Sequence, residues 1–179
     1  MRLVLAATAA MLAPASAFAV DYLTAEQASR SMFADADRFE AHEVNLDAAA
    51  LRKLAADGVQ PRSARWTVQI ARRAEATLGY VVVDNVVGKF ELITYAVGLS
   101  RDAAITQVEI LSYRESHGFE VRLPAWRRQF VGKTHASALQ VGDDIANISG
   151  ATLSCTHVTD GVHRIVAVVD AAKRNGGLP

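Results

Sequence analysis

Residues 149–154, Ser-Gly-Ala-Thr-Leu-Ser, place hydroxyl groups beside residues that have almost no side chain. Gly150 and Ala151 leave the backbone uncovered, so a planar ligand or a modifying enzyme could approach the Thr152 hydroxyl closely. A helix is predicted from Ser154 onward, and the unpaired N–H groups of a first helical turn favour an anion. Local physics therefore allows a phosphate attached to Thr152 or held beside it.

Two other uses of these hydroxyls are open. Ser149, Thr152 and Ser154 could cap the helix, because hydroxyls at a helix start accept hydrogen bonds from its unpaired N–H groups. Spacing alone favours caps over a ligand. Ser149 or Ser154 as a hydrolase nucleophile ranks last, since the chain has no Gly-x-Ser-x-Gly turn around either residue.

The elements that must position this segment follow an α+β pattern. Apolar and polar residues alternate in several runs joined by short turns, which predicts antiparallel pairing. We therefore expect a central antiparallel sheet flanked by helices. The predicted strands cover 38–44, 65–73, 78–85, 89–100 and 103–115. One helix is predicted to follow Thr24, with Gln27 completing a capping box. A second covers 45–58 and ends at Gly58, a third runs from Pro124 to Gly132, and a fourth begins at Ser154.

The last predicted helix has an apolar stripe at helical spacing, which predicts burial against the sheet. The stripe consists of Val158, Val162, Ile165, Val166 and Val169. Cys155, the single cysteine of the chain, is expected to be a small buried residue near the start of this helix. Gly176 is expected to close the ordered part of the chain.

The ends and the composition indicate one exported domain. Residues 1–19 have a basic start, a short apolar run and an Ala-x-Ala cleavage site, which are typical of a secretory signal peptide. Residues 20–179 are then expected to form a single periplasmic or otherwise extracytoplasmic domain without a transmembrane segment. The balance of 19 basic and 19 acidic side chains argues against a nucleic-acid partner. The histidines have no metal-ligand spacing, so no metal site is expected.

Three segments, in order, carry a resemblance to a known family. "SGATLS" ahead of a valine-rich helix resembles the attachment motif of the FMN-binding domain family, which includes the C subunit of sodium-pumping NADH:quinone reductases and the G subunit of Rnf complexes. "YRESHG" resembles the family's loop with Glu115 and Gly118 in the matching positions, and "WRRQFVGK" resembles its Trp-x-x-x-Phe-x-Gly-Lys segment. The resemblance is strongest over 97–169 and implies an α+β fold of the FMN-binding domain type.

The resemblance implies that Thr152 carries FMN through a phosphoester bond made by an ApbE-type flavin transferase from FAD. The rest of the motif, Ser149, Gly150, Ala151, Leu153 and Ser154, would then surround the cofactor. Glu115, Ser116, His117 and Gly118 would approach the flavin or form a plain turn. Trp126 and Phe130 would line its pocket or belong to the core, and Lys133 would meet the cofactor or lie on a solvated helix surface.

The implied function is that of a small secreted electron-transfer flavoprotein. It would be a carrier or redox subunit rather than a stand-alone enzyme, with a membrane redox protein as electron donor or acceptor. The alternative is a cofactor-free binding module that keeps the same fold. Ala146 favours this alternative, because an aspartate is common at that position in the family, although Asp144 two residues earlier could serve instead.

Overall fold

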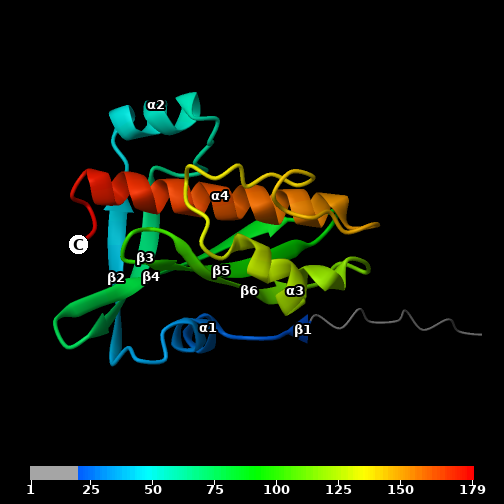
Figure 1. Ribbon diagram of the computed structural model, residues 1–179, viewed down its shortest axis with the longest axis horizontal. Helices are drawn as coiled ribbons and strands as arrows, with labels where there is room; N and C mark the ends of the chain where they lie inside the picture. The colour runs from blue at the N-terminus through cyan, green and yellow to red at the C-terminus, as the bar shows by residue number, and fades with distance from the viewer. Residues whose placement is uncertain (1–19) are drawn as a thin grey trace, which may run out of the picture.

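The computed structural model describes residues 20–179, so the predicted signal peptide lies outside the described residues (Figure 1). An antiparallel sheet of six strands forms the centre, in the order β1-β6-β5-β4-β3-β2. The strands are β1 (Val20–Asp21), β2 (Arg38–Asn45), β3 (Arg65–Arg73), β4 (Ala76–Val87), β5 (Leu92–Ser100) and β6 (Ile105–Tyr113). Strands β2 to β6 form a meander, and β1 pairs with the outer edge of β6. The predicted α+β class with its antiparallel sheet is confirmed.

Helices cover the two faces of the sheet unequally. The long helix α4 (Thr152–Arg174) lies across one face, with α2 (Ala48–Ala56) beyond it, and α1 (Ala25–Met32) lies on the other face (Figure 1). All five residues of the predicted apolar stripe of α4 are buried. They belong to the main core, whereas α1 covers a small cluster consisting of Ala28, Val81, Ala96 and Leu111.

The predicted signals for helix ends at α1 and α2 are confirmed. The Thr24 side chain accepts a hydrogen bond from the backbone of Gln27, whose side chain accepts one from the backbone of Thr24 in return. Asp47 caps the start of α2, and Gly58 follows its end with φ of 78°, in the left-handed region that glycine adopts without strain.

The helix predicted from Pro124 to Gly132 is shorter and less regular than expected. The 3₁₀ turn η1 (Phe119–Arg122) precedes one turn of α-helix, α3 (Pro124–Arg127), and a second 3₁₀ turn, η2 (Arg128–Phe130), follows it. The N–H of Gly132 bonds the carbonyl of Ile105 at 2.8 Å, and the N–H of Ile105 bonds the carbonyl of Lys133 at 2.9 Å. These backbone bonds join the segment to the start of β6, so the helix cannot continue.

The two ends of α4 differ from the sequence-based expectation. The helix begins at Thr152, two residues before the predicted start. The expectation that Gly176 closes the ordered part is wrong, because Leu178 is buried in the main core and the carbonyl of Gly177 lies 2.9 Å from His42 Nε2. Within residues 20–179, no helix has the length and apolar character needed to cross a bilayer.

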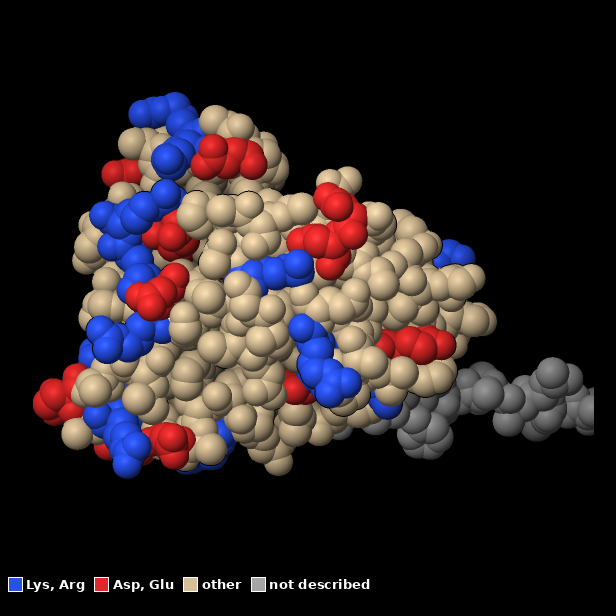
Figure 2. All heavy atoms as spheres, in the orientation of Figure 1, with Lys and Arg blue, Asp and Glu red and all other residues tan. Residues whose placement is uncertain are grey.

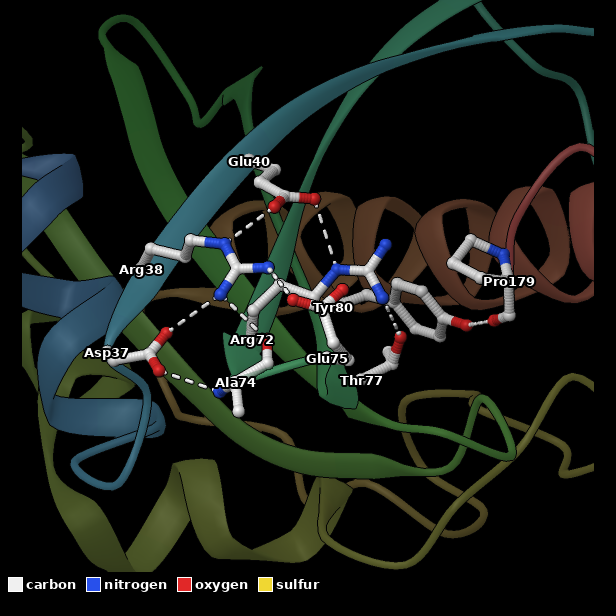
Figure 3. Close-up of polar contacts among 9 residues, drawn as sticks. All are labelled: Asp37, Arg38, Glu40, Arg72, Ala74, Glu75, Thr77, Tyr80 and Pro179. Atoms are coloured by element: carbon white, nitrogen blue, oxygen red, sulfur yellow. Dashed lines mark hydrogen bonds and ion pairs between the residues drawn. The ribbon is translucent and has the colours of Figure 1, made fainter.

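A network of ion pairs fixes the outer strands at one end of the sheet (Figure 3). Arg38 donates to Glu40 at 2.8 Å and to the carbonyl of Ala74 at 2.7 Å, while Arg72 donates to the other Glu40 oxygen at 3.1 Å. Asp37 accepts from the N–H of Ala74 at 2.6 Å. The hydrogen bond from Arg38, followed by that from Arg72, lowers the pKa of Glu40. Each of these charges has a partner within the fold, which favours a structural role.

Charge is distributed unevenly along the molecule. On the face shown in Figure 2, Lys, Arg, Asp and Glu side chains gather at the left, over α2 and β2. The right-hand end, where α4 begins, carries fewer charged side chains on this face (Figures 1 and 2). The hydroxyl-rich segment predicted to do chemistry thus lies away from the densest charge on this face.

Candidate functional site

A cleft with a volume of about 390 Å³ lies at the start of α4. This volume is within the range of about 300–1,000 Å³ that is usual for small-molecule and cofactor sites. Three segments far apart in sequence form it: the turn between β4 and β5, the loop after β6, and the first residues of α4. The residues lining it are Lys89, Phe90, Glu115, Ser116, His117, Gly150, Ala151, Thr152, Leu153 and Ser154.

Thr152 is the first residue of α4, and its side chain is exposed. The N-cap is Ala151, and among the described residues no side chain caps this helix. The alternative that Ser149, Thr152 and Ser154 serve as caps is therefore wrong. The Thr152 oxygen accepts a hydrogen bond from the Asn147 amide at 3.2 Å. An exposed hydroxyl thus stands at an uncapped helix start, where the helix dipole favours a phosphate.

Tyr113, the last residue of β6, joins the loop after β6 to the start of α4. Its hydroxyl donates to the carbonyl of His117 and lies 3.2 Å from Oγ of the buried Ser154. Burial raises the pKa of Tyr113, and the hydrogen bond with Ser154 opposes this effect. The phenol therefore stays protonated at neutral pH and keeps both contacts. Sequence reasoning missed Tyr113, although it lies only two residues before Glu115.

Gly118 brings the same loop into close contact with the α4 segment. Its φ is 82°, and a Cβ at this position would overlap the Cβ of Ala151 and lie 2.8 Å from the Tyr113 hydroxyl. Only glycine meets both the conformational and the spatial requirement. Ser116 and His117, on the outer part of the loop, are exposed at the cleft.

The Glu115 carboxylate holds the turn between β4 and β5. Its Oε1 accepts hydrogen bonds from the N–H groups of Phe90, at 2.6 Å, and Glu91, at 3.0 Å. Partial burial would raise the pKa of Glu115, but the backbone hydrogen bonds and the charge of Lys89 outweigh it and lower the pKa. Glu115 is therefore an anion at neutral pH, and it accepts hydrogen bonds from the protein backbone.

Trp126, Phe130 and Lys133 lie outside the lining of the cleft. The two aromatic rings are buried in the main core, 5.1 Å apart and edge to face, which is the core alternative stated for them. The Trp126 indole donates to the carbonyl of Ala146 at 2.8 Å. Lys133 pairs with Asp144 at 2.8 Å, so it is neither in the cleft nor a freely solvated side chain. The contacts of Trp126 with Ala146 and of Lys133 with Asp144 hold the segment that leads to Thr152.

Lys89 and Phe90 line the cleft, and the sequence pattern does not predict this. The pattern places them in a strand starting at residue 89, but β5 begins only at Leu92. Both residues instead form the tip of the β4–β5 turn, where the Lys89 ammonium lies 4.9 Å from the centroid of the Phe90 ring. The signal that could have indicated a turn rather than a strand is Gly88, directly before these two residues.

Comparison with known proteins supports the resemblance found in the sequence. Residues 88–167, which include every residue lining the cleft, match the model of the FMN-binding domain. Over these residues the chain is similar to the FMN-binding domain family. It is 34% identical over 99 residues to the G subunit of the ion-translocating oxidoreductase complex of Methanosarcina acetivorans, a match that covers 52% of this chain and 53% of that protein. The chain therefore spans about half the length of this relative.

A solved structure extends the likeness of fold beyond the matched domain. The C subunit of the Na⁺-translocating NADH-quinone reductase from Parabacteroides distasonis superposes with a TM-score of 0.53 at 16% identity. The superposition covers 83% of this chain and 84% of that one. At this level of identity the match concerns the fold alone, and it extends the likeness of fold beyond residues 88–167.

The residues that line the cleft fit FMN, the cofactor named in the matching domain. The uncapped start of α4 and Lys89 suit a phosphate, and the exposed Phe90 and Leu153 suit a planar ring. Within residues 20–179, no three His, Cys, Asp or Glu side chains gather to hold a metal ion. Cys155 is fully buried as predicted, and burial raises the pKa of its thiol.

Proposed function

We propose that this chain is an electron-transfer flavoprotein whose FMN is attached through a phosphoester to Thr152. The proposal rests on the exposed hydroxyl of Thr152, which stands at the uncapped start of α4 and lines the cleft. All residues that line this cleft lie within the segment that matches the FMN-binding domain. Gly150 has a φ of 81°, and apart from Gly150 itself and its two chain neighbours no heavy atom lies within 4 Å of the place that a Cβ would take there. This open space leaves room for a second protein to reach the hydroxyl.

The attachment would be a phosphoryl transfer catalysed by an ApbE-type flavin transferase. Thr152 Oγ1 attacks the phosphorus on the FMN side of FAD, the P–O–P bridge breaks, and AMP leaves. A threonine hydroxyl is a weak nucleophile, so the base that takes its proton belongs to the transferase. Thr152 is then a substrate of modification. Asn147 can keep donating to the same oxygen after it has become part of the ester.

The bound flavin supplies the redox chemistry, and the chain supplies attachment, orientation and electrostatic environment. Residues 20–179 form the single domain of this proposal, exported by the signal peptide to the periplasm. A covalent bond suits that compartment, because a dissociated cofactor would be lost from it. The electron partner is a membrane redox protein, in line with the relative that is named as a subunit of an ion-translocating oxidoreductase complex.

One observation favours the alternative, a cofactor-free binding module. Asp144, the candidate replacement for the acidic residue absent at Ala146, is already engaged. Its carboxylate pairs with Lys133 and accepts from the N–H groups of Leu139, at 3.1 Å, and Gln140, at 2.8 Å. Partial burial would raise the pKa of Asp144, but the contact with Lys133 and these two hydrogen bonds outweigh that effect and lower the pKa. Asp144 therefore stabilises its own loop.

Co-expression with an ApbE-type transferase tests the proposal. The wild-type band should fluoresce as a flavin after denaturing electrophoresis, and intact mass should rise by one FMN less one water. Thr152→Ala should abolish both signals, whereas Ser149→Ala, which removes a neighbouring exposed hydroxyl, should keep them. A wild-type chain that stays unmodified would favour the cofactor-free module, and flavin retained in Thr152→Ala would place the bond elsewhere.

A further inference from the structure

Phe90 is conspicuously exposed for its size. Its side chain is 72% exposed at the tip of the β4–β5 turn, more than any other exposed large apolar side chain among residues 20–179. A single exposed apolar residue is ordinary on a protein surface. Phe90, however, lines the same cleft as Thr152, with the 45% exposed Leu153 also in the lining.

The turn that carries Phe90 is held in place by the fold. Glu115 accepts hydrogen bonds from the N–H groups of Phe90 and Glu91, and the N–H of Gly88 bonds the carbonyl of Glu91 at 2.8 Å. The absence of a side chain at Gly88 makes room for this carboxylate, because a Cβ there would lie only 2.5 Å from Glu115 Oε1. Two charge-assisted hydrogen bonds therefore set the backbone position of an otherwise exposed ring.

We propose that Phe90 covers the isoalloxazine ring of the FMN carried by Thr152, and that Glu115 is the positioning residue that holds Phe90 over the cleft. The inference rests on the proposed function. An aromatic side chain and a flavin both gain from contact between their planes, and covering the ring removes apolar surface of both from water. Lys89, above the same phenyl ring, adds a positive charge at the cleft.

This assignment gives two residues of the loop after β6 separate tasks. Gly118 brings that loop against Ala151 at the start of α4, while Glu115 extends in the other direction to the β4–β5 turn. The loop thus joins the attachment residue to the residue that covers the ring. The distance between Thr152 and Phe90 is set by contacts on both sides of one short segment.

The test uses the flavin as a reporter of contact with position 90. An indole in van der Waals contact with a flavin quenches its fluorescence by donating an electron to the excited ring and receiving it back. Phe90→Trp should therefore shorten the fluorescence lifetime of the covalently loaded protein several-fold. Phe119→Trp is the matched control, since Phe119 is also exposed, at 55%, but lies outside the cleft. It should leave the lifetime unchanged.

The role of Glu115 is tested in the same background. Glu115→Ala combined with Phe90→Trp should restore a long-lived fraction of the fluorescence, because the turn is no longer held over the cleft. Phe90→Leu should increase quenching by iodide, since the ring loses its aromatic cover. Electrophoresis under denaturing conditions accompanies every measurement and reports the covalent flavin content.

The outcomes separate the two proposals. If the flavin is covalently bound and Phe90→Trp behaves like Phe119→Trp, then Phe90 does not contact the ring, and attachment at Thr152 stands. If the wild-type chain takes up no flavin at all, both proposals are overturned. If Glu115→Ala leaves the quenching by Trp at position 90 intact, Glu115 is not the positioning residue.

Discussion

At the scale of single residues, most polar side chains of the candidate site form hydrogen bonds within the protein. The Glu115 carboxylate accepts from two backbone N–H groups, and the Tyr113 hydroxyl contacts His117 and Ser154. Thr152 is different, because its exposed hydroxyl has one amide contact and opens to solvent. Chemistry is therefore expected at Thr152, and positioning at Glu115 and Tyr113.

The lowered pKa of Glu115 predicts a pH dependence of stability. The unfolded chain has the ordinary carboxyl pKa of 4.5 and binds the proton more readily than the folded chain. The contribution of Glu115 is therefore fully present above that value and is lost as pH falls through the lower folded pKa. Glu115→Gln should lower the free energy of unfolding by about 1 kcal/mol at about pH 7 and by much less at about pH 3.

Urea unfolding of the two proteins across this pH range measures the effect. The exposed Glu43, outside the cleft, offers a control for the loss of one carboxylate, and Glu43→Gln should lower the free energy of unfolding by less than Glu115→Gln does at about pH 7. If the Glu115→Gln and wild-type curves stay parallel from neutral to acid pH, the carboxylate does not stabilise the turn, and its role as positioning residue loses its basis.

At the scale of elements, α4 comes close to the sheet at Gly161. The buried Tyr95 of β5 donates from its hydroxyl to Asp84 of β4 at 3.1 Å, and Arg62 holds the same carboxylate at 2.7 Å. Burial, followed by the charge of Asp84, raises the pKa of Tyr95. A Cβ at Gly161 would overlap the Tyr95 hydroxyl, so the glycine is what allows the helix to approach.

This contact reverses the usual effect of replacing a helical glycine. Alanine inside a helix is normally more favourable than glycine by about 1 kcal/mol. Gly161→Ala should instead destabilise the protein by about 1–3 kcal/mol, because the methyl group forces α4 away from β5. Tyr95→Phe removes the hydroxyl and should partly restore stability in the double variant. Thermal unfolding of both, with Asp160→Ala as an exposed control, measures the coupling, and additive effects would contradict it.

Most elements could be predicted from the sequence because their apolar periodicity is local information. The stripe of α4, the capping box at Thr24 and the alternating strands all follow from side chains a few residues apart. The segment after Pro124 could not be predicted, since its backbone pairs with Ile105, about twenty-five residues earlier in the chain. Nonlocal hydrogen bonds of this kind leave no periodic pattern.

The candidate site was predictable in part for the same reason. The loop with Glu115 and the Thr152 segment each carry a motif, and the fold brings them together in one cleft. Trp126 and Phe130 have the spacing of a helical face, but that spacing cannot distinguish a core pair from a cofactor wall. Phe90 was hidden in a run that resembles a strand, because the carboxylate that holds its turn comes from the distant Glu115.

At the scale of the whole molecule, the sheet separates two layers of unequal depth. The main core joins α4, α2 and the residues around Trp126 to one face, whereas α1 covers a cluster of four buried residues on the other. The cleft lies at the start of α4, on the side of the main core, since Ala151 and Cys155 both belong to that core. Stability of the cleft should therefore follow α4 and be largely independent of α1.

Native-state hydrogen exchange can test this separation. Amides of α1 should exchange through an opening that costs less free energy than global unfolding, while amides in the middle of α4 should exchange close to the global value. Met32 packs α1 against the sheet, near Gly98, so Met32→Ala should lower protection in α1 alone. Ile165→Ala, in the buried stripe of α4, should lower protection throughout the sheet and α4 by about 2–5 kcal/mol.

Substitutions on the two faces of the sheet should affect the proposed cofactor differently. With the chain loaded by a flavin transferase, Met32→Ala should leave the flavin lifetime and its exposure to iodide unchanged, because α1 covers the opposite face of the sheet from the cleft. Ile165→Ala should increase both heterogeneity of the lifetime and exposure to iodide, since the start of α4 loosens with the rest of that helix. Equal effects of the two substitutions would mean that the two faces unfold as one unit and that the cleft depends on both.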